Sequence, residues 1–316
     1  MLNYLTSILP IAIYIVVLML LDSFRLVKAR MLAVCIALGI ISCAMSALIT
    51  WNIDVAPWTI SIEEILKGLM VLALTMRKRI VFFVEAMVYG ATVGSGFALA
   101  ENILYLQSIP DMMPGTALFR GLSTSLLHMG CTALMAAAIL DTKYARKALA
   151  FIIVPVAIHY VYNMMIVEPL IQMTVTILTF LAIFVIISNY NERRIYRWFD
   201  HSITFDIKLL GAIREGKLID TNTGKYLQLI KKQFDPEVFF DLICFVQLYL
   251  ELVIEGKSRM LLEEEGLARP LTAEEQTQHK EKVTELKQLR KNIGLLGEYL
   301  LRPVIIIQDQ DMRFMQ

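Results

Sequence analysis

An acidic pair and a lysine stand inside an apolar segment of the sequence, and side chains of these types can activate water. Glu63 and Glu64 are adjacent, and Lys67 follows them within residues 58–75. Residues three and four apart on an α-helix share a face, so the ammonium of Lys67 can reach either carboxylate. One lysine cannot neutralise two glutamates, and we therefore expect other cations or a shared proton to complete the site.

Charges inside an apolar segment are costly in a membrane. Each one at the bilayer centre costs roughly 2.5–3.5 kcal/mol on insertion scales. We therefore expect these side chains to face the interior of a helix bundle, to pair with one another or to line a water-filled cavity. The same reasoning applies to the polar residues of three later apolar segments, which are Glu101, Arg120, His128, His159 and Asn163.

Spacing and depth indicate that these polar residues gather in one site. His159 and Asn163 are four residues apart and therefore share a helix face. Because neighbouring spans alternate in direction, the carboxylates, the histidines and Asn163 are expected in the outer half of the bilayer or near its centre, at about 1.5 Å per residue. Arg120 has two interpretations, as an interfacial anchor or as the partner of Glu101.

Three kinds of chemistry fit such a set of side chains. Carboxylates and histidines at one depth can activate water as general bases. Three or four nitrogen and oxygen ligands can also hold a divalent metal such as zinc. The same groups can form a proton relay. The sequence contains no H-E-x-x-H motif, so the need for a metal stays open at this level.

Composition points to a membrane protein with several spans. Of the 316 residues, 57% are hydrophobic and only 19% are charged, which is unlike a soluble domain. The formal net charge of +1 indicates no nucleic-acid partner. The spacing of the cysteines fits neither a disulfide framework nor a metal site, so we interpret them as small buried hydrophobic residues. They are Cys35, Cys43, Cys131 and Cys244.

The elements that must position the polar residues are helices long enough to cross a bilayer. The first apolar segment lacks a basic n-region and a small-residue cleavage site, so we expect it to remain as a span. We predict an all-α membrane bundle of about seven spans, each near the ~20 residues that a bilayer requires. The predicted spans are residues 4–21, 31–50, 58–75, 80–107, 117–140, 148–167 and 169–188.

The distribution of loop cations predicts the orientation. Lysine and arginine cluster after the first, third, fifth and seventh spans, and the intervening loops hold none. By the positive-inside rule, the N-terminus is expected outside and the C-terminus in the cytoplasm of a multi-pass cell-membrane protein. The four clusters contain Arg25, Lys28 and Arg30; Arg77, Lys78 and Arg79; Lys143, Arg146 and Lys147; and Arg193, Arg194 and Arg197.

Residues 199–316 carry most of the charge and are predicted to form a cytoplasmic helical domain, apart from a transmembrane core at residues 1–198. Asp235-Pro236 is typical of a helix start, and Thr272 with Glu275 is typical of a capping box. We expect about four helices. The nearly apolar residues 238–254 could be an eighth span, but their charges and length favour a buried helix of a small bundle.

At its polar motifs the sequence resembles the PrsW family of intramembrane proteases, within the wider group that includes the CAAX prenyl endopeptidases. The resemblance covers about residues 55–165. CAAX enzymes have arginine in the first motif and histidine at the position of Glu101, so the likeness is to PrsW proteins. The matching motifs are Glu63-Glu64-x-x-Lys67, Phe97-x-x-x-Glu101, His128 and His159-x-x-x-Asn163.

The resemblance implies a peptide-bond hydrolase that acts inside the membrane. In such relatives a glutamate activates water, and a histidine and an asparagine stabilise the oxyanion. The implied roles are as follows: Glu63 or Glu64 as the general base, Lys67 as the residue that holds their geometry, His128 and Glu101 as the rest of the water or metal site, and His159 and Asn163 as oxyanion donors.

The expected partners are the lipid bilayer and a membrane-protein substrate, which the resemblance suggests is a signalling protein similar to an anti-sigma factor. The expected cut lies in or near the outer half of the substrate's span. Alternative readings are a CAAX-type processing endopeptidase, a non-enzymatic scaffold or a proton-coupled carrier. Carriers often contain inverted repeats, and we find no repeat in this sequence. The oligomeric state stays open.

Overall fold

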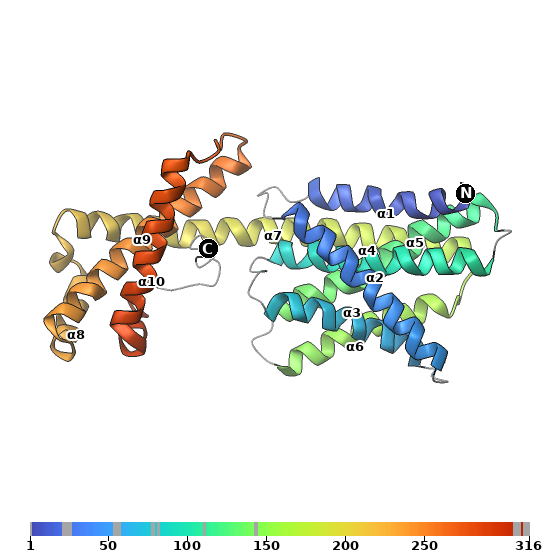
Figure 1. Ribbon diagram of the computed structural model, residues 1–316, viewed down its shortest axis with the longest axis horizontal. Coiled ribbons are helices and arrows are strands. Elements are labelled where there is room, and N and C mark those ends of the chain that lie inside the picture. The colour runs from blue at the N-terminus through green and yellow to red at the C-terminus, as the bar shows by residue number, and fades with distance from the viewer. Residues whose placement is uncertain are drawn as a thin grey trace. The chain divides into compact units, whose positions relative to one another are not determined.

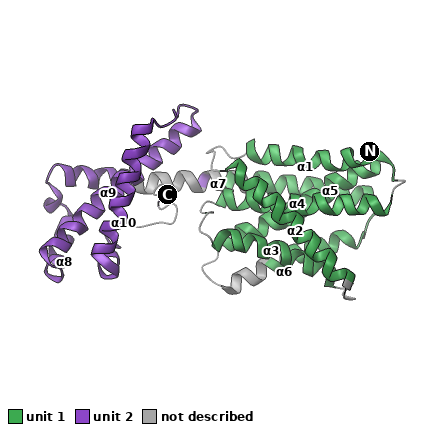
Figure 2. Ribbon diagram, in the orientation of Figure 1, with its two compact units in different colours: residues 1–192 green, residues 193–316 purple. Residues whose placement is uncertain are grey.

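Helices are the only regular elements in the described part of the chain (Figure 1). The computed structural model of the protein describes residues 2–20, 27–52, 58–76, 80, 83–109, 112–141, 145–305 and 311. These residues divide into two compact units, Met1–Glu192 and Arg193–Gln316 (Figure 2). The expected all-α helical bundle is confirmed, because long apolar helices make up the first unit.

The first unit contains the helices that precede residue 193. Five of its helices are long and apolar enough to cross a membrane. Two further predicted spans are helical but differ in kind, because α3 carries three charged residues and the apolar part of α6 covers only Ile152–Asn163. The helices are α1 Leu2–Leu20, α2 Ala29–Asn52, α3 Thr59–Met76, α4 Phe83–Ser108, α5 Pro114–Asp141, α6 Ala145–Asn163 and α7 Pro169–Arg214, which continues into the second unit.

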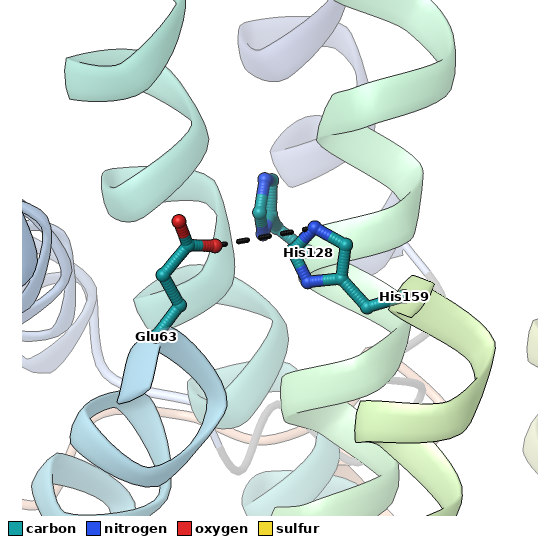
Figure 3. Close-up of side chains that lie close together, drawn as sticks. All are labelled: Glu63, His128 and His159. Atoms are coloured by element: carbon teal, nitrogen blue, oxygen red, sulfur yellow. Dashed lines mark ion pairs between the residues drawn. The ribbon is translucent and has the colours of Figure 1, made fainter. Parts of the chain in front are cut away.

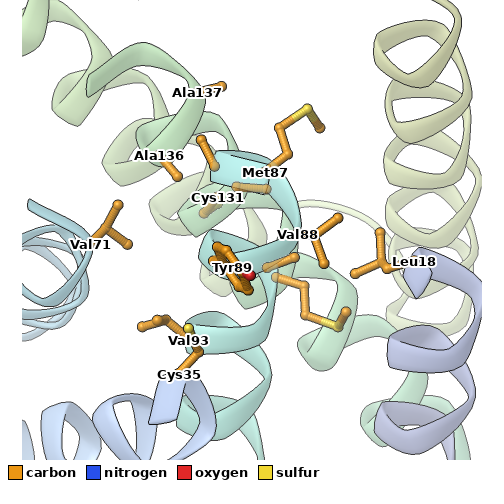
Figure 4. Packing of buried hydrophobic residues seen from close by; sticks show 14 of the residues in the cluster. Leu18, Cys35, Val71, Met87, Val88, Tyr89, Val93, Cys131, Ala136 and Ala137 are labelled. Atoms are coloured by element: carbon orange, nitrogen blue, oxygen red, sulfur yellow. The ribbon is translucent and has the colours of Figure 1, made fainter. Parts of the chain in front are cut away.

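The core of the first unit forms around α4 and α5. Helix α4 is buried along most of its length, and α5 packs against α1, α3, α4 and α6. The predicted burial of Cys35, Cys43 and Cys131 is confirmed, while Cys244 is partly exposed. Figure 4 shows part of the apolar cluster, to which α4 contributes Met87, Val88, Tyr89 and Val93, α5 contributes Cys131, Ala136 and Ala137, and other helices contribute Leu18, Cys35 and Val71.

Small residues let α4 approach its neighbours closely, as Gly90-x-x-x-Gly94 predicts. A Cβ added at Gly94 would lie 2.3 Å from the carbonyl oxygen of His128, which belongs to α5. A Cβ at Gly90 would lie 2.7 Å from the carbonyl oxygen of Thr132, one turn further along α5. The two backbones are therefore in contact where α5 presents His128.

Successive helices of the first unit alternate in direction, which brings one end of each to the same end of the bundle (Figure 1). The start of α3, the end of α4, the start of α5 and the end of α6 meet there. The orientation of this bundle in a membrane stays a prediction. Several of the cations on which it rests, namely Arg25, Lys143 and residues 77–79, lie outside the described residues.

The second unit has a separate helical core. It contains the end of α7, the short turns η2 Leu218–Asp220 and η3 Lys231–Gln233, and the helices α8 Asn222–Ile230, α9 Pro236–Glu264 and α10 Ala273–Leu301. The predicted helix start at Pro236 and the capping box of Thr272 with Glu275 are confirmed. Residues 238–254 lie in α9, which supplies Phe245, Tyr249 and Leu250 to this core, as expected for a buried helix.

The contact between α4 and α5 predicts the effect of one added methyl group. Gly94→Ala forces the helices apart, since its Cβ would meet backbone rather than a flexible side chain. Overpacking of this kind costs about 1–3 kcal/mol, so the purified protein should unfold at a lower temperature. Gly115→Ala is the matched control because no atom lies within 4 Å of its added Cβ. Equal unfolding temperatures for the two variants would contradict the close contact.

Candidate active site

Helix α3 carries Glu63, Glu64 and Lys67, the acidic pair and the lysine of the site. Glu64 and Lys67 are fully buried and form an ion pair, with Lys67 Nζ 2.6 Å from Glu64 Oε1. The side chain of Glu63 keeps 15% of its surface exposed. The two adjacent carboxylates therefore differ in environment: Glu64 is enclosed with a cation, and Glu63 faces a more open space.

His128 of α5 is held from both sides. Lys67 Nζ lies 2.9 Å from His128 Nδ1, and His128 Nε2 lies 2.9 Å from Glu101 Oε2 of α4. An ammonium group can only donate, so Nδ1 accepts the hydrogen bond and the ring carries its proton on Nε2. His128 then donates to Glu101. Lys67 thus selects the tautomer of His128 as well as compensating the charge of Glu64.

His159 of α6 is oriented by a hydrogen bond to Glu64, the carboxylate that also pairs with Lys67. Its Nδ1 lies 2.7 Å from Glu64 Oε1, and an ionised carboxylate accepts, so Nδ1 carries the proton. In the neutral ring, Nε2 is then an unprotonated nitrogen. This nitrogen lies 3.9 Å from Glu63 Oε2, the separation marked by the dashed line in Figure 3. The separation is too long for a direct hydrogen bond and is suited to a bridging water or ion.

The buried ion pair between Glu64 and Lys67 makes the site sensitive to substitution of either residue. Glu64 Oε1 accepts hydrogen bonds from both Lys67 and His159. Glu64 Oε2 is buried and has no hydrogen-bond partner among the described residues. Removing one partner of a buried pair leaves an uncompensated charge, which costs about 3–5 kcal/mol. Lys67 is therefore structural and electrostatic at once.

Phe97 forms the apolar wall of the site. Its ring centroid lies 4.8 Å from that of His128 and 4.6 Å from Lys67 Nζ. The ring is 1% exposed, so it excludes water from the Lys67–His128 contact. Excluding water strengthens the electrostatic interactions inside the site. The sequence motif included Phe97, but without a role, because periodicity along one helix does not show which side chain a ring covers.

Arg120 of α5 is positioned by Glu101 and by Tyr105 of α4. Its Nη2 lies 3.8 Å from Glu101 Oε1, and its guanidinium carbon lies 3.5 Å from the ring centroid of Tyr105. Of the two interpretations of Arg120, this geometry favours the partner of Glu101. The cation–π contact with Tyr105 adds a second constraint that sequence reasoning missed.

Six of the seven predicted site residues lie together, and Asn163 does not. The six are Glu63, Glu64, Lys67, Glu101, His128 and His159. Asn163 is the last residue of α6, its side chain is exposed, and it makes no ion pair or side-chain hydrogen bond with the six among the described residues. Sequence reasoning gave no role to Asn102, which follows Glu101, and missed Thr124, whose hydroxyl lies 3.2 Å from Asn102 Oδ1. An i+4 step from Arg120 to Thr124 to His128 is the signal that could have indicated Thr124.

The donor set fits a divalent metal. Glu63, His128 and His159 each offer one ligand atom, and these atoms lie within 4.8 Å of one another (Figure 3). Tetrahedral zinc keeps its ligand atoms about 3.4 Å apart, so small side-chain movements would close the set. The bond from His159 Nδ1 to Glu64 is the outer-sphere contact that metal-bound histidines usually have. Both ring nitrogens of His128 are in hydrogen bonds, so His128 would become a ligand by exchanging the bond of its unprotonated Nδ1 with Lys67 for the metal.

Comparison with known proteins identifies a family for this chain. A family model described as PrsW family intramembrane metalloprotease matches residues 27–188, more than half of the chain. This range includes every residue of the cluster. No match to the chain appears among curated proteins or among solved structures.

The geometry predicts that the purified chain binds about one zinc per molecule and loses it in His159→Ala. The variant removes the ligand whose unprotonated nitrogen is already available. Metal content by mass spectrometry after dialysis against weak chelators measures this. His279→Ala, which changes a histidine of α10, is the matched control and should keep the metal. Zinc-free protein that remains catalytically active in strong chelators would contradict the metal site.

Proposed function

This chain belongs to the PrsW family of intramembrane metalloproteases, and on that premise we propose that it hydrolyses a peptide bond of another membrane protein at Glu63, His128 and His159. The observation that carries the proposal is the 3.9 Å gap between Glu63 Oε2 and His159 Nε2. His159 is oriented by its buried bond to Glu64, and Glu63 stays partly exposed on the facing side. A water molecule between them would face a carboxylate that is ready to accept its proton.

Glu63 is the proposed general base, in preference to Glu64. Glu64 is fully buried and already accepts from Lys67 and His159, so it has little capacity to meet water or substrate. Glu63 is partly exposed. Its carboxylate can take a proton from water and return it to the leaving nitrogen of the cut peptide bond. Glu64 and Lys67 then act by orienting the two histidines.

A divalent metal such as zinc, held by Glu63, His128 and His159, would supply an activated water at neutral pH and polarise the substrate carbonyl. The chain's own contribution is to orient the ligands and to control their protons. Glu64 turns His159 Nε2 toward Glu63. Glu101 is the nearest acceptor for the Nε2 proton of His128. Since a carboxylate has two oxygens, Glu63 can bind with one and accept a proton with the other.

The resemblance implied that His159 and Asn163 both donate to the oxyanion, and we assign this role to Asn163 alone. While His159 Nδ1 donates to Glu64, Nε2 of the neutral ring has no hydrogen to donate to an oxyanion. We therefore assign His159 to the metal and Asn163 to the oxyanion. Asn163 is exposed one turn beyond His159, where its amide can turn toward a bound substrate.

The substrate is proposed to be a single-span signalling protein, similar to an anti-sigma factor, cut within the bilayer. A CAAX-type enzyme or a non-enzymatic scaffold or carrier remains as the alternative. The second unit, Arg193–Gln316, is proposed to regulate or recruit from the cytoplasm, since the clustered site residues all lie in the first unit.

Glu63→Gln and His159→Ala are expected to lower proteolysis by about 10²–10⁴-fold, because a general base or a metal ligand is lost. Glu63→Gln should insert and unfold like the wild type because Glu63 is partly exposed, whereas His159→Ala also loses a buried bond to Glu64 and should unfold at a lower temperature. Cleavage of a co-expressed membrane substrate, followed by immunoblot, measures the effect. Glu215→Gln is the matched control, because Glu215 is exposed and forms an ion pair at the surface with Lys217. Full activity of Glu63→Gln would reject the assignment, and normal partner binding without cleavage in the wild type would favour the scaffold.

The position of the site predicts where the substrate is cut. Glu63 and Glu101 lie roughly 6–10 Å from the ends of their helices, at about 1.5 Å per residue, and the loop cations place those ends outside. Water enters most easily from the nearer surface. We therefore expect the scissile bond in the outer half of the substrate's span or just outside it. Sequencing the new terminus of the cleaved substrate decides this, and a cut at the cytoplasmic end would favour the CAAX-type alternative.

A further inference from the structure

A buried amide with an unpaired atom lies beside the reaction centre. Asn102 of α4 follows Glu101 directly, and only 1% of its surface is exposed. Its Nδ2 has no hydrogen-bond partner among the residues that the structure describes. Buried polar groups in proteins are nearly always paired, so an unpaired one beside a catalytic cluster points to a ligand.

The contact between Thr124 and Asn102 still leaves one atom of the amide without a hydrogen-bond partner. Thr124 of α5 lies 3.2 Å from Asn102 Oδ1 and 2.7 Å from the carbonyl oxygen of Arg120. A hydroxyl has one hydrogen, and the closer carbonyl can only accept. Turning the amide of Asn102 by 180° would bring Nδ2 to Thr124 and leave Oδ1 unpaired instead. One amide atom therefore lacks a partner in either orientation.

Asn102 belongs to a row of contacts that runs from the reaction centre toward the end of the bundle. Along the facing sides of α4 and α5, Glu101 meets His128, Asn102 meets Thr124, and Tyr105 meets Arg120. Nε of Arg120 is a second buried donor without a partner in the described residues. Two unsatisfied groups thus lie in one row, next to the carboxylate that binds His128.

The charges of this row favour a neutral ligand. The guanidinium of Arg120 has the carboxylate of Glu101 at 3.8 Å, so its charge is already balanced. An additional anion would lie close to Glu101 and be repelled. A peptide group suits the row better, because it is neutral and offers both an acceptor oxygen and a donor N–H.

We propose that Asn102 binds a peptide group of the substrate close to the scissile bond. This inference rests on the proposed protease function and adds a substrate-binding residue to it. A transmembrane helix must unwind to be cut, and each freed backbone group is costly in the bilayer unless it finds a partner. The unpaired amide of Asn102 and the freed peptide group satisfy each other, with Arg120 Nε as the neighbouring donor.

Asn102→Leu tests the proposal through stability and cleavage together. Leucine has the same branched arrangement of heavy atoms and removes a polar group that lacks a partner, and Thr124 keeps its bond to the carbonyl oxygen of Arg120. The unfolding temperature of the purified full chain should therefore be equal or higher. Cleavage of a synthetic fluorogenic transmembrane peptide should fall by about tenfold to a hundredfold in kcat/KM. A lower unfolding temperature, or unchanged kcat/KM, would overturn the proposal.

Ester replacement in the same peptide locates the contact. Each peptide bond flanking the cut is replaced in turn by an ester, which removes the N–H and weakens the carbonyl acceptor. One position should slow cleavage by the wild type and have no further effect in Asn102→Leu. Equal ester effects in both enzymes would refute a direct contact.

Two variants separate this proposal from the proposed function. Thr92→Val, in the same helix, removes a buried hydroxyl whose bond to Val88 is already satisfied, and it should cleave as the wild type does. Glu63→Gln should be inactive if the protease assignment holds. A wild type that cuts nothing would reject the protease function itself, while the unfolding temperature of Asn102→Leu would still test the binding role.

Discussion

The rest of the site depends on one ion pair that is fully enclosed by protein. Lys67 and Glu64 are both inaccessible to solvent and 2.6 Å apart. An unpaired charge of either residue would be energetically costly in the interior of the bundle. Each residue also forms a second bond, which extends to another helix. Lys67 reaches His128 of α5, and Glu64 reaches His159 of α6. The pair thus fixes the two histidines, their proton positions and their distance from Glu63 in a single arrangement.

Close helix packing makes that arrangement possible. The side chains of Lys67, His128 and Glu101 span α3, α5 and α4 with contacts of 2.9 Å, which leaves no room for loosely spaced helices. Gly94 brings the backbone of α4 against the carbonyl of His128 itself. Since protein interiors are close-packed and deform little, a shift of the backbone at Gly94 would also shift the imidazole of His128. Packing residues and reactive residues are therefore parts of one structure in α4 and α5.

The site combines rigid orienting groups with unsatisfied ones. Glu64, Lys67 and Phe97 are enclosed, whereas Glu63 and Glu101 retain access to the outside of the bundle. An enzyme needs both kinds, because orientation requires paired and buried groups and turnover requires groups that water and substrate can reach. A scaffold would have no need for a partly exposed carboxylate that faces an unprotonated histidine nitrogen at 3.9 Å. This contrast is the physical reason to prefer an enzyme within the family to which the chain belongs.

The sequence by itself determined the helical class, the approximate position of each long helix and the polar residues that cannot face lipid. These follow from local rules: apolar length, the cost of charge in a bilayer, the i+3 spacing that puts Lys67 beside Glu64 and the i+4 spacing that puts Asn163 on the face of His159. The tertiary structure alone decided which carboxylate is enclosed, which nitrogen of each histidine carries the proton, that Asn163 is exposed at the end of α6 and that Asn102 Nδ2 has no partner among the described residues. Periodicity shows which face of one helix a residue occupies, but it contains no distance between helices. Partners such as Lys67–His128 and Glu64–His159 are chosen by those distances, across 61 and 95 residues of chain.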